Sequence, residues 1–118
     1  MNTKEATSIL SSLAQESRLK TFRLLVDAGF EGMLAGDIST KMGVVQNTMS
    51  FHLAHLEKHK LIKKIKSGRN ITYTANFKAM DNLIKFLFDN CCANSKQKTC
   101  IDTNVFNKCQ KHTKSDSK

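Results

Sequence analysis

Several kinds of residue are scarce or missing in this chain of 118 residues. It contains no proline, no tryptophan, one tyrosine and five glycines, which excludes collagen-like and proline-rich or glycine-rich low-complexity architectures. No apolar run approaches the roughly 20 residues that a membrane span requires, and residues 1–10 lack the apolar segment of a secretory signal. We therefore expect one globular domain that is cytoplasmic and has no membrane partner.

Acidic residues are also in short supply. Ten Asp and Glu stand against nineteen Lys and Arg, and the formal net charge is +9 at pH 7. An excess of this size favours a polyanionic partner, and nucleic acid is the foremost candidate. The sequence contains no glycine-rich phosphate loop and no cofactor fingerprint. We therefore do not expect an enzyme.

Cysteine is absent from the first 90 residues and then occurs four times, as Cys91, Cys92, Cys100 and Cys109. A small secreted domain would spread a disulfide framework through its body. We therefore expect free thiols in a reducing compartment. Metal binding, redox sensing and inert packing are all open to such thiols.

Apolar residues recur with helical spacing in the first third of the chain. Leu19, Phe22 and Val26 form a stripe that predicts an amphipathic helix over residues 14–28, ended by Gly29. A shorter helix is predicted over residues 34–42. It ends at Gly43, a residue type that adopts the left-handed conformation without a Cβ penalty. A tight turn should follow.

The middle of the chain predicts a further helix and a hairpin. Over residues 46–60, one stripe is buried, formed by Met49, Leu53 and Leu56, so the other faces of this helix can meet a partner. Two β-prone runs follow, over residues 61–66 and 71–75. They predict a hairpin with a basic tip.

Two further apolar edges lie near the ends of the domain. They are the stripe Met80, Ile84 and Leu87 of a last helix that begins near Phe77, and the edge Ile9, Leu10 and Leu13 near the start. Beyond residue 92 the sequence is mostly polar. We therefore divide the chain into a domain over residues 1–92 and a flexible, basic, cysteine-containing tail over residues 93–118.

The order of these elements is that of a winged helix-turn-helix, a mainly α-helical fold with a small β-hairpin. In this fold the second short helix enters the major groove, and the hairpin tip reaches an adjacent phosphate or the minor groove. The side chains predicted to meet DNA are those of Gln46, Asn47, Thr48, Ser50, Phe51, Lys63, Lys64, Lys66 and Arg69. Amides can pair with adenine, an aromatic ring can touch a thymine methyl group, and cations contact the backbone. The alternative is a solvated helix beside a hairpin whose charges only maintain solubility.

Three stretches of sequence favour the DNA-binding interpretation. "LAQESRLKTFRLL", "DISTKMGVVQNTMSFHLAHLEKHKLI" and "IKSGRNITYTANF" together resemble the ArsR/SmtB family of arsenic-responsive winged-helix repressors, over about residues 10–92. The resemblance implies a homodimer paired through its first and last helices, which leaves operator DNA when an inducer binds. Many relatives have Ser or Pro before the recognition helix. This chain has Val45, which cannot supply a side-chain N-cap.

Members of this family differ in where they hold the inducer. Residues 33–37 lack the Cys-x-Cys pair of one branch, and residues 77–90 lack the histidines of zinc-type members. The ending "FDNCC" with a later cysteine resembles a branch that senses trivalent arsenic through an adjacent cysteine pair and a third thiol. The resemblance implies a site for arsenite, antimonite or methylarsenite at Cys91, Cys92 and Cys100. Three thiolates suit pyramidal trivalent arsenic.

Other roles for the cysteines remain open. Four cysteines could hold structural zinc, although the usual Cys-x2–4-Cys spacing is missing. Cys91 continues the apolar stripe of the last helix and could be a small buried hydrophobe. A redox switch of vicinal or distal thiols is a third alternative. A constitutive architectural DNA-binding protein with incidental cysteines is the fourth.

Three histidines, His52, His55 and His59, share one face of the predicted recognition helix. Their spacing could hold a metal, but DNA and solvent would compete for the same face. We expect them to be surface residues, one or two of which touch phosphate.

Overall fold

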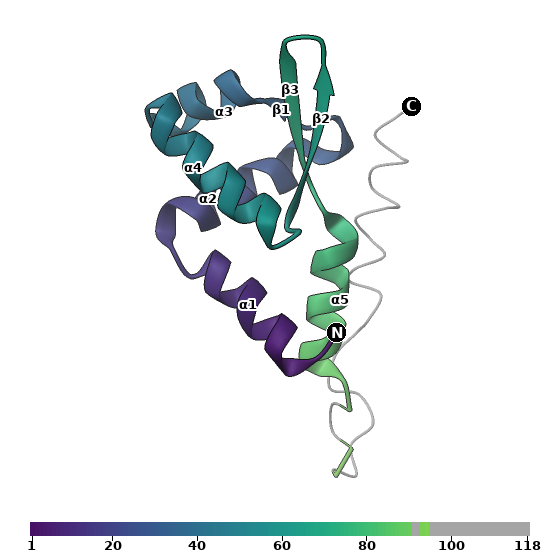
Figure 1. Cartoon of the computed structure of the whole chain (residues 1–118). Coiled ribbons are helices and arrows are strands. Elements are labelled where there is room, and N and C mark those ends of the chain that lie inside the picture. Colours follow the sequence, from purple (N-terminus) through teal and green to yellow (C-terminus); the bar gives the residue numbers. More distant parts are fainter. Residues whose placement is uncertain (91–92, 95–118) are drawn as a thin grey trace.

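The computed structural model describes residues 1–90 and 93–94, which form five α-helices and a small sheet (Figure 1). The elements in chain order are α1 (Thr3–Leu13), α2 (Glu16–Ala28), the 3-10 turn η1 (Gly29–Glu31), β1 (Met33–Leu34), α3 (Ala35–Met42), α4 (Gln46–Lys58), β2 (Ile62–Ser67), β3 (Asn70–Ala75) and α5 (Phe77–Phe88). The four cysteines and nearly all of the tail predicted over residues 93–118 lie outside the described residues. Within the described part, no helix is long and apolar enough to cross a membrane.

The sheet is antiparallel, with strand order β1-β3-β2. The predicted hairpin is β2–β3, in register from Ile62 opposite Ala75 to Ser67 opposite Asn70. β1 was not predicted, because sequence analysis assigned Leu34 to a helix, whereas Met33 pairs with Tyr73 and Leu34 with Thr72. A strand of two residues is too short to produce a recognisable alternation of polar and apolar positions.

Gly32 allows β1 to approach β3 closely. Its φ is +70°, and a Cβ at this position would lie 2.3 Å from the carbonyl oxygen of Tyr73 and 2.5 Å from Cγ2 of Thr74. Real Cβ atoms do not approach other atoms this closely, so any side chain would displace β3. Glycine is therefore required here both for the backbone conformation and for the space.

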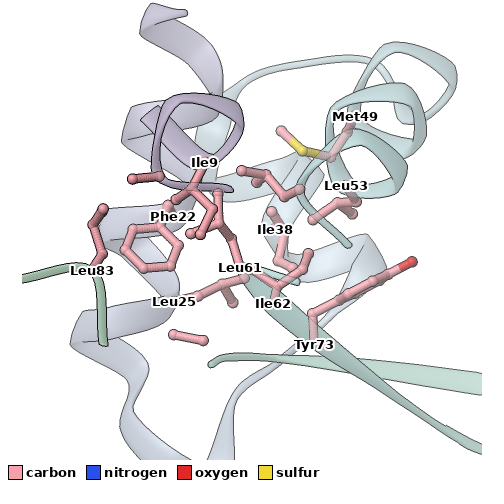
Figure 2. Packing of buried hydrophobic residues seen from close by; sticks show 13 residues of the cluster. Ile9, Phe22, Leu25, Ile38, Met49, Leu53, Leu61, Ile62, Tyr73 and Leu83 are labelled. Atoms are coloured by element: carbon pink, nitrogen blue, oxygen red, sulfur yellow. The ribbon is translucent and has the colours of Figure 1, made fainter. Parts of the chain in front are cut away.

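One hydrophobic core joins the helices to the sheet (Figure 2). Its buried apolar residues are Ala6, Ile9, Phe22, Leu25, Ile38, Met49, Leu53, Leu56, Leu61, Ile62, Tyr73, Ala75 and Leu83. The stripe predicted for α4 is confirmed, since all three of its members are in this set. The core therefore holds α4 by one face only.

One of the predicted apolar stripes was displaced around its helix. In α2 the structure buries Phe22 and Leu25, whereas Leu19 and Val26 are 43% and 39% exposed. The stripe of α5 lies on a helix that the resemblance assigns to a dimer contact, and its Leu87 is 53% exposed, while Leu83 enters the chain's own core. An apolar stripe shows which side of a helix is hydrophobic. It does not show which of two neighbouring stripes meets the chain's own core.

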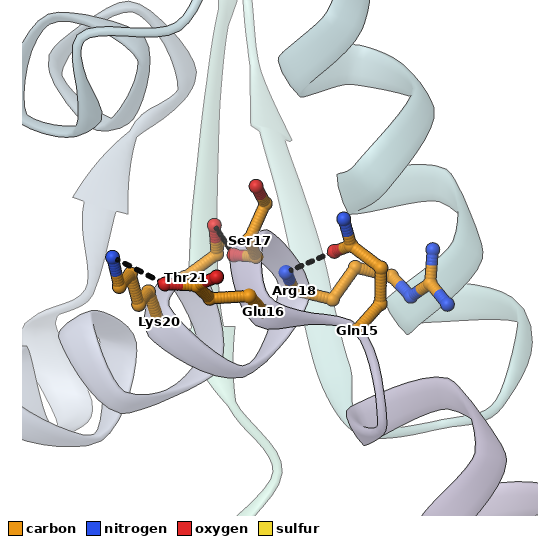
Figure 3. A network of polar contacts seen from close by, with 6 residues as sticks. All are labelled: Gln15, Glu16, Ser17, Arg18, Lys20 and Thr21. Carbon is orange, nitrogen blue, oxygen red and sulfur yellow. Dashed lines mark hydrogen bonds and ion pairs between the residues drawn. The ribbon is translucent and has the colours of Figure 1, made fainter.

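Polar contacts fix the start of α2 against the end of α1 (Figure 3). The backbone N–H of Arg18 donates to Oε1 of Gln15 at 2.8 Å, which caps α2, and Nε of Arg18 donates to the Ser12 carbonyl at 2.7 Å. In the next turn, the Thr21 hydroxyl donates to the Ser17 carbonyl at 2.8 Å. These bonds set the angle between the first two helices.

A second set of hydrogen bonds joins α1 to α4. The Ser8 hydroxyl lies 2.9 Å from Nδ1 of His59, and the Ser12 hydroxyl lies 2.9 Å from Nδ1 of His55. The two imidazole rings are 4.8 Å apart, centroid to centroid. Serines four residues apart on one helix thus meet histidines four residues apart on another, because both spacings return to the same helix face.

The surroundings of His55 disfavour its charged form. Burial lowers its pKa below the ordinary value of 6.5, and the nearby positive charge of Arg18 lowers it further, with smaller contributions from His59, Lys58 and His52. When pH falls below 6.5, the unfolded chain takes up a proton at this residue before the folded protein does. Folding stability is therefore lost as the solution is acidified.

We expect His55→Gln, which removes the titrating ring, to reduce this acid-induced loss. Melting temperatures measured between about pH 7.5 and about pH 5.5 should fall less in the variant than in the unmodified protein. The comparison uses the change with pH, so it does not depend on the variant's stability at neutral pH. Equal losses in the two proteins would contradict the role assigned to His55.

Gly32→Ala should destabilise the fold strongly, by about 2–4 kcal/mol, because strain at positive φ adds to a steric clash with β3. Gly29 provides a matched control. Its φ is +73°, similar to that of Gly32, but a Cβ there meets nothing within 4 Å. Denaturant unfolding should therefore show a smaller loss, of about 1–2 kcal/mol, for Gly29→Ala. Equal losses would mean that the approach of β1 to β3 contributes nothing.

Candidate nucleic-acid interface

α3 and α4 are joined by the tight turn that the sequence predicts. α3 ends at Gly43, which has a left-handed conformation with φ of 66°. The backbone N–H groups of Gly43 and Val44 donate to the carbonyls of Thr40 and Ser39 at 3.2 and 3.1 Å. These bonds satisfy the last carbonyls of α3 and reverse the chain within three residues. The predicted helix-turn-helix is confirmed.

The outer face of α4 carries the side chains predicted to read DNA. All five are exposed, and they are Gln46, Asn47, Thr48, Ser50 and Phe51. The ring of Phe51 is the largest of these, and the residue is 74% exposed. Single exposed apolar residues are common on protein surfaces. On this face, however, the ring stands beside amide and hydroxyl groups that suit base edges, and it can contact a thymine methyl group.

The first turn of α4 has free backbone donors. Val45 occupies the N-cap position, and within the described part of the chain it makes no side-chain capping bond. This outcome agrees with the sequence analysis. The first N–H groups of α4 therefore point toward solvent beside Gln46, with the positive end of the helix dipole. Such an uncapped terminus can hold a phosphate of the DNA backbone.

The β2–β3 hairpin extends toward the same end of the molecule as α3 and the start of α4 (Figure 1). Lys66 and Arg69 lie exposed near its tip. Nζ of Lys64 lies 3.5 Å from a carboxylate oxygen of Glu57, a surface ion pair that contributes little by itself. Buried Leu61 and Ile62 hold the base of the hairpin in the same core as α4.

The three histidines of α4 do not lie on the face that would meet DNA. His55 and His59 are half-buried and bonded to α1, and His52 is half-buried with Nδ1 enclosed. Among the residues that the structure describes, no cluster of three or more His, Cys, Asp or Glu could hold a metal ion. The expectation that one or two of the histidines touch phosphate therefore has no support in this arrangement.

Sequence analysis missed the role of these histidines as a link between two helices. The matching spacing of Ser8 and Ser12 was the available signal, but pairing two helices this far apart requires the fold. The predicted thiol site at Cys91, Cys92 and Cys100 lies outside the described residues.

Comparisons with known proteins agree with this geometry. A helix-turn-helix domain family matches residues 13–65. The transcriptional activator HlyU of Vibrio cholerae is 30% identical over 96 residues, which cover 79% of this chain and 84% of that protein. The structure of reduced HlyU superimposes with a TM-score of 0.59 and 28% identity, covering 75% of this chain and 93% of that one.

Two other solved structures share the fold at lower identity. An ArsR-like transcriptional regulator from Rhodococcus sp. RHA1 gives a TM-score of 0.63 at 22% identity, covering 77% of this chain and 82% of that one. A homodimeric winged helix-turn-helix DNA-binding domain from Mycobacterium bovis gives 0.59 at 19% identity, covering 80% and 88%.

The match to HlyU spans 79% of this chain, and the helix-turn-helix family match, over residues 13–65, includes α2, α3 and α4. The proteins in this group regulate transcription and are not enzymes. The chain belongs to the ArsR family of DNA-binding winged helix-turn-helix transcriptional regulators.

Proposed function

We propose that this protein binds operator DNA as a homodimer, with the first turns of α4 in the major groove and the tip of the β2–β3 hairpin on the backbone. One observation carries the proposal: the exposed outer face of α4, its uncapped N-terminus and the basic hairpin tip all lie at one end of the molecule. The side chains there match the contacts that DNA offers.

The roles follow from the chemistry of each side chain. The amides of Gln46 and Asn47 pair with the adenine edge, and the ring of Phe51 contacts a thymine methyl group. The hydroxyls of Thr48 and Ser50 donate to bases or phosphates. Lys66 and Arg69 contact phosphates on the flank of the site.

The dimer forms through α1 and α5. Both helices carry exposed apolar side chains in the isolated chain: Leu10, Leu87 and Phe88 are 42%, 53% and 45% exposed. The Mycobacterium bovis domain of the same fold is homodimeric. Two copies related by a twofold axis would place their α4 helices in successive major grooves, about one turn of DNA apart.

The thiols near the C-terminus provide the signal. Reversible oxidation has the support of the relationship to HlyU, a protein solved in a reduced form. In this chemistry two thiols lose two electrons and two protons to a peroxide, giving a disulfide and water. DNA affinity changes when the disulfide favours a different arrangement of the two wings.

Trivalent arsenic is a second candidate signal for the same residues. The observation in its favour is the set of thiols itself, with Cys91 and Cys92 adjacent and Cys100 following closely. Arsenite, antimonite or methylarsenite would bind their thiolates and release the protein as a repressor. HlyU is named an activator, so a reporter placed behind the operator also decides the direction of regulation.

Substitutions in the DNA-binding surface should separate base reading from charge. Asn47→Ala should weaken binding to DNA upstream of the protein's own gene by about 1–3 kcal/mol, with little effect on unrelated DNA. Arg69→Ala should weaken binding to the upstream DNA and to unrelated DNA alike. It should also reduce the slope of log affinity against log salt concentration by about one. Arg23→Ala removes the same guanidinium charge from an exposed position of α2, outside the surface assigned to DNA, and should change neither. If Arg23→Ala and Arg69→Ala behave alike, the hairpin tip makes no specific contact.

Peroxide and arsenite should distinguish the two signals. Whichever of the two agents is the signal should lower the DNA affinity of the reduced protein by about tenfold or more. This corresponds to the coupling free energy of about 1–3 kcal/mol that is typical of allosteric proteins. A thiol reductant restores binding after peroxide. Each of Cys91→Ser, Cys92→Ser and Cys100→Ser should abolish the response to arsenite, which takes three thiolates. The response to peroxide should be lost only in the variants that remove a member of the disulfide pair, and Cys109→Ser is the comparison variant. An unchanged response in the first three variants would place the signal elsewhere in the chain.

A further inference from the structure

A cleft of about 530 Å³ opens between α1, the C-terminal end of α4, the start of β2 and the first turn of α5. These elements meet on the side of the molecule away from the hairpin tip (Figure 1). The volume is within the range of pockets that bind small molecules. Of the side chains predicted to meet DNA, only Lys63 is among the residues that line it.

The charge of this cleft is strongly one-sided. One carboxylate, that of Glu5, lines it together with four lysines, which are Lys58, Lys60, Lys63 and Lys78. The ion pairs found in the described part of the chain engage Lys20, Lys64 and Lys85 instead, so the four cleft lysines have no carboxylate partner there. Ammonium groups gathered around one cleft repel each other. An anion bound among them would relieve that repulsion.

Lys60 has a backbone conformation that residues other than glycine rarely adopt. Its φ is 62°, in the left-handed region. Its N–H donates to the Glu57 carbonyl at 2.9 Å, and that of Leu61 donates to the Leu56 carbonyl at 3.0 Å. This bonding pattern ends a helix at a residue that is usually glycine. The chain places a long cationic side chain there, facing the cleft.

The lining also offers uncharged hydrogen-bonding groups. Asn76 joins the turn after α4 to the first turn of α5, since its Nδ2 donates to the Lys60 carbonyl at 2.8 Å and its Oδ1 accepts from Ala79 N–H at 3.2 Å. Asn82 and Ser8 line the same space. The first turn of α5 adds the positive end of a helix dipole to the field of the lysines.

We propose that this cleft binds a small phosphorylated anion with at least two negative charges. Several lysines together require more than one charge, and phosphate oxygens accept hydrogen bonds from ammonium and amide groups at once. The volume exceeds that of a bare phosphate, so the cleft has room for a larger phosphorylated molecule. Because Lys58 ends the recognition helix and Lys63 lies on β2, an occupant touches both DNA-binding elements. The site thus adds an effector to the proposed regulator, and it is independent of the thiols.

The test is calorimetric titration of the reduced, full-length protein with inorganic pyrophosphate at constant ionic strength. The key variant is Lys60→Gly. Glycine relieves the left-handed backbone, so this variant should fold with an unchanged or higher melting temperature. Its affinity for pyrophosphate should nevertheless fall by roughly three- to tenfold. A loss of binding together with a gain of stability cannot come from misfolding.

Two further variants make the result specific. Lys78→Ala removes a cation from the opposite wall of the cleft and should weaken binding to a similar extent. Lys20→Ala removes an exposed charge from α2, outside the cleft, and should leave the affinity unchanged. The proposal is overturned if pyrophosphate does not bind, or if Lys20→Ala weakens it as much as Lys60→Gly. It is also overturned if Lys60→Gly weakens operator binding as Arg69→Ala does, since the cleft would then hold DNA phosphate.

Discussion

The inward stripe of α4, formed by Met49, Leu53 and Leu56, is the packing constraint on which the rest of the molecule depends. Each of these side chains is 2% exposed or less, and burying each contributes about 1.5–3 kcal/mol. Rotating the helix by one residue, about 100°, would expose this stripe and bury polar groups such as Ser50 and Glu57. No hydrogen bond or charge on the outer face could offset that cost. The apolar core therefore determines which side chains are presented to DNA.

The other contacts of α4 transmit its position to the rest of the protein. Hydrogen bonds from His55 and His59 join it to α1, and the ion pair of Glu57 with Lys64 joins it to the hairpin. A displacement of α1 is therefore transmitted directly to α4 through these contacts. Coupling between a signal and DNA requires two arrangements that the signal distinguishes. These polar contacts are suited to change between two arrangements, because they cost less to exchange than the buried stripe.

The helix-turn-helix and the hairpin could be predicted because their signals are local. Gly43 marks the turn, and the apolar spacing of α4 predicts a helix of about four turns with one solvent-exposed face. The strand β1 could not be predicted, because it exists only through Gly32 and the distant strand β3. The displaced stripe of α2 has a related cause. Several apolar side chains of this helix were available, and which of them are buried depends on partners elsewhere in the chain.

The candidate sites divide in the same way. The exposed residues of α4 were identified from sequence, since exposure follows from the buried stripe of the same helix. The basic cleft was not, because its lysines are spread from α4 to α5 and converge only in the fold.

A net charge of +9 was interpreted as an excess directed at DNA. The structure divides that excess between the hairpin tip and a cleft on the other side, and Lys63 and Lys64 illustrate the division. Neighbours on a strand point to opposite faces, so one lysine lines the cleft while the other pairs with the recognition helix. Total charge can indicate a polyanionic partner, but only the arrangement of the cations shows that two separate anions can be accommodated.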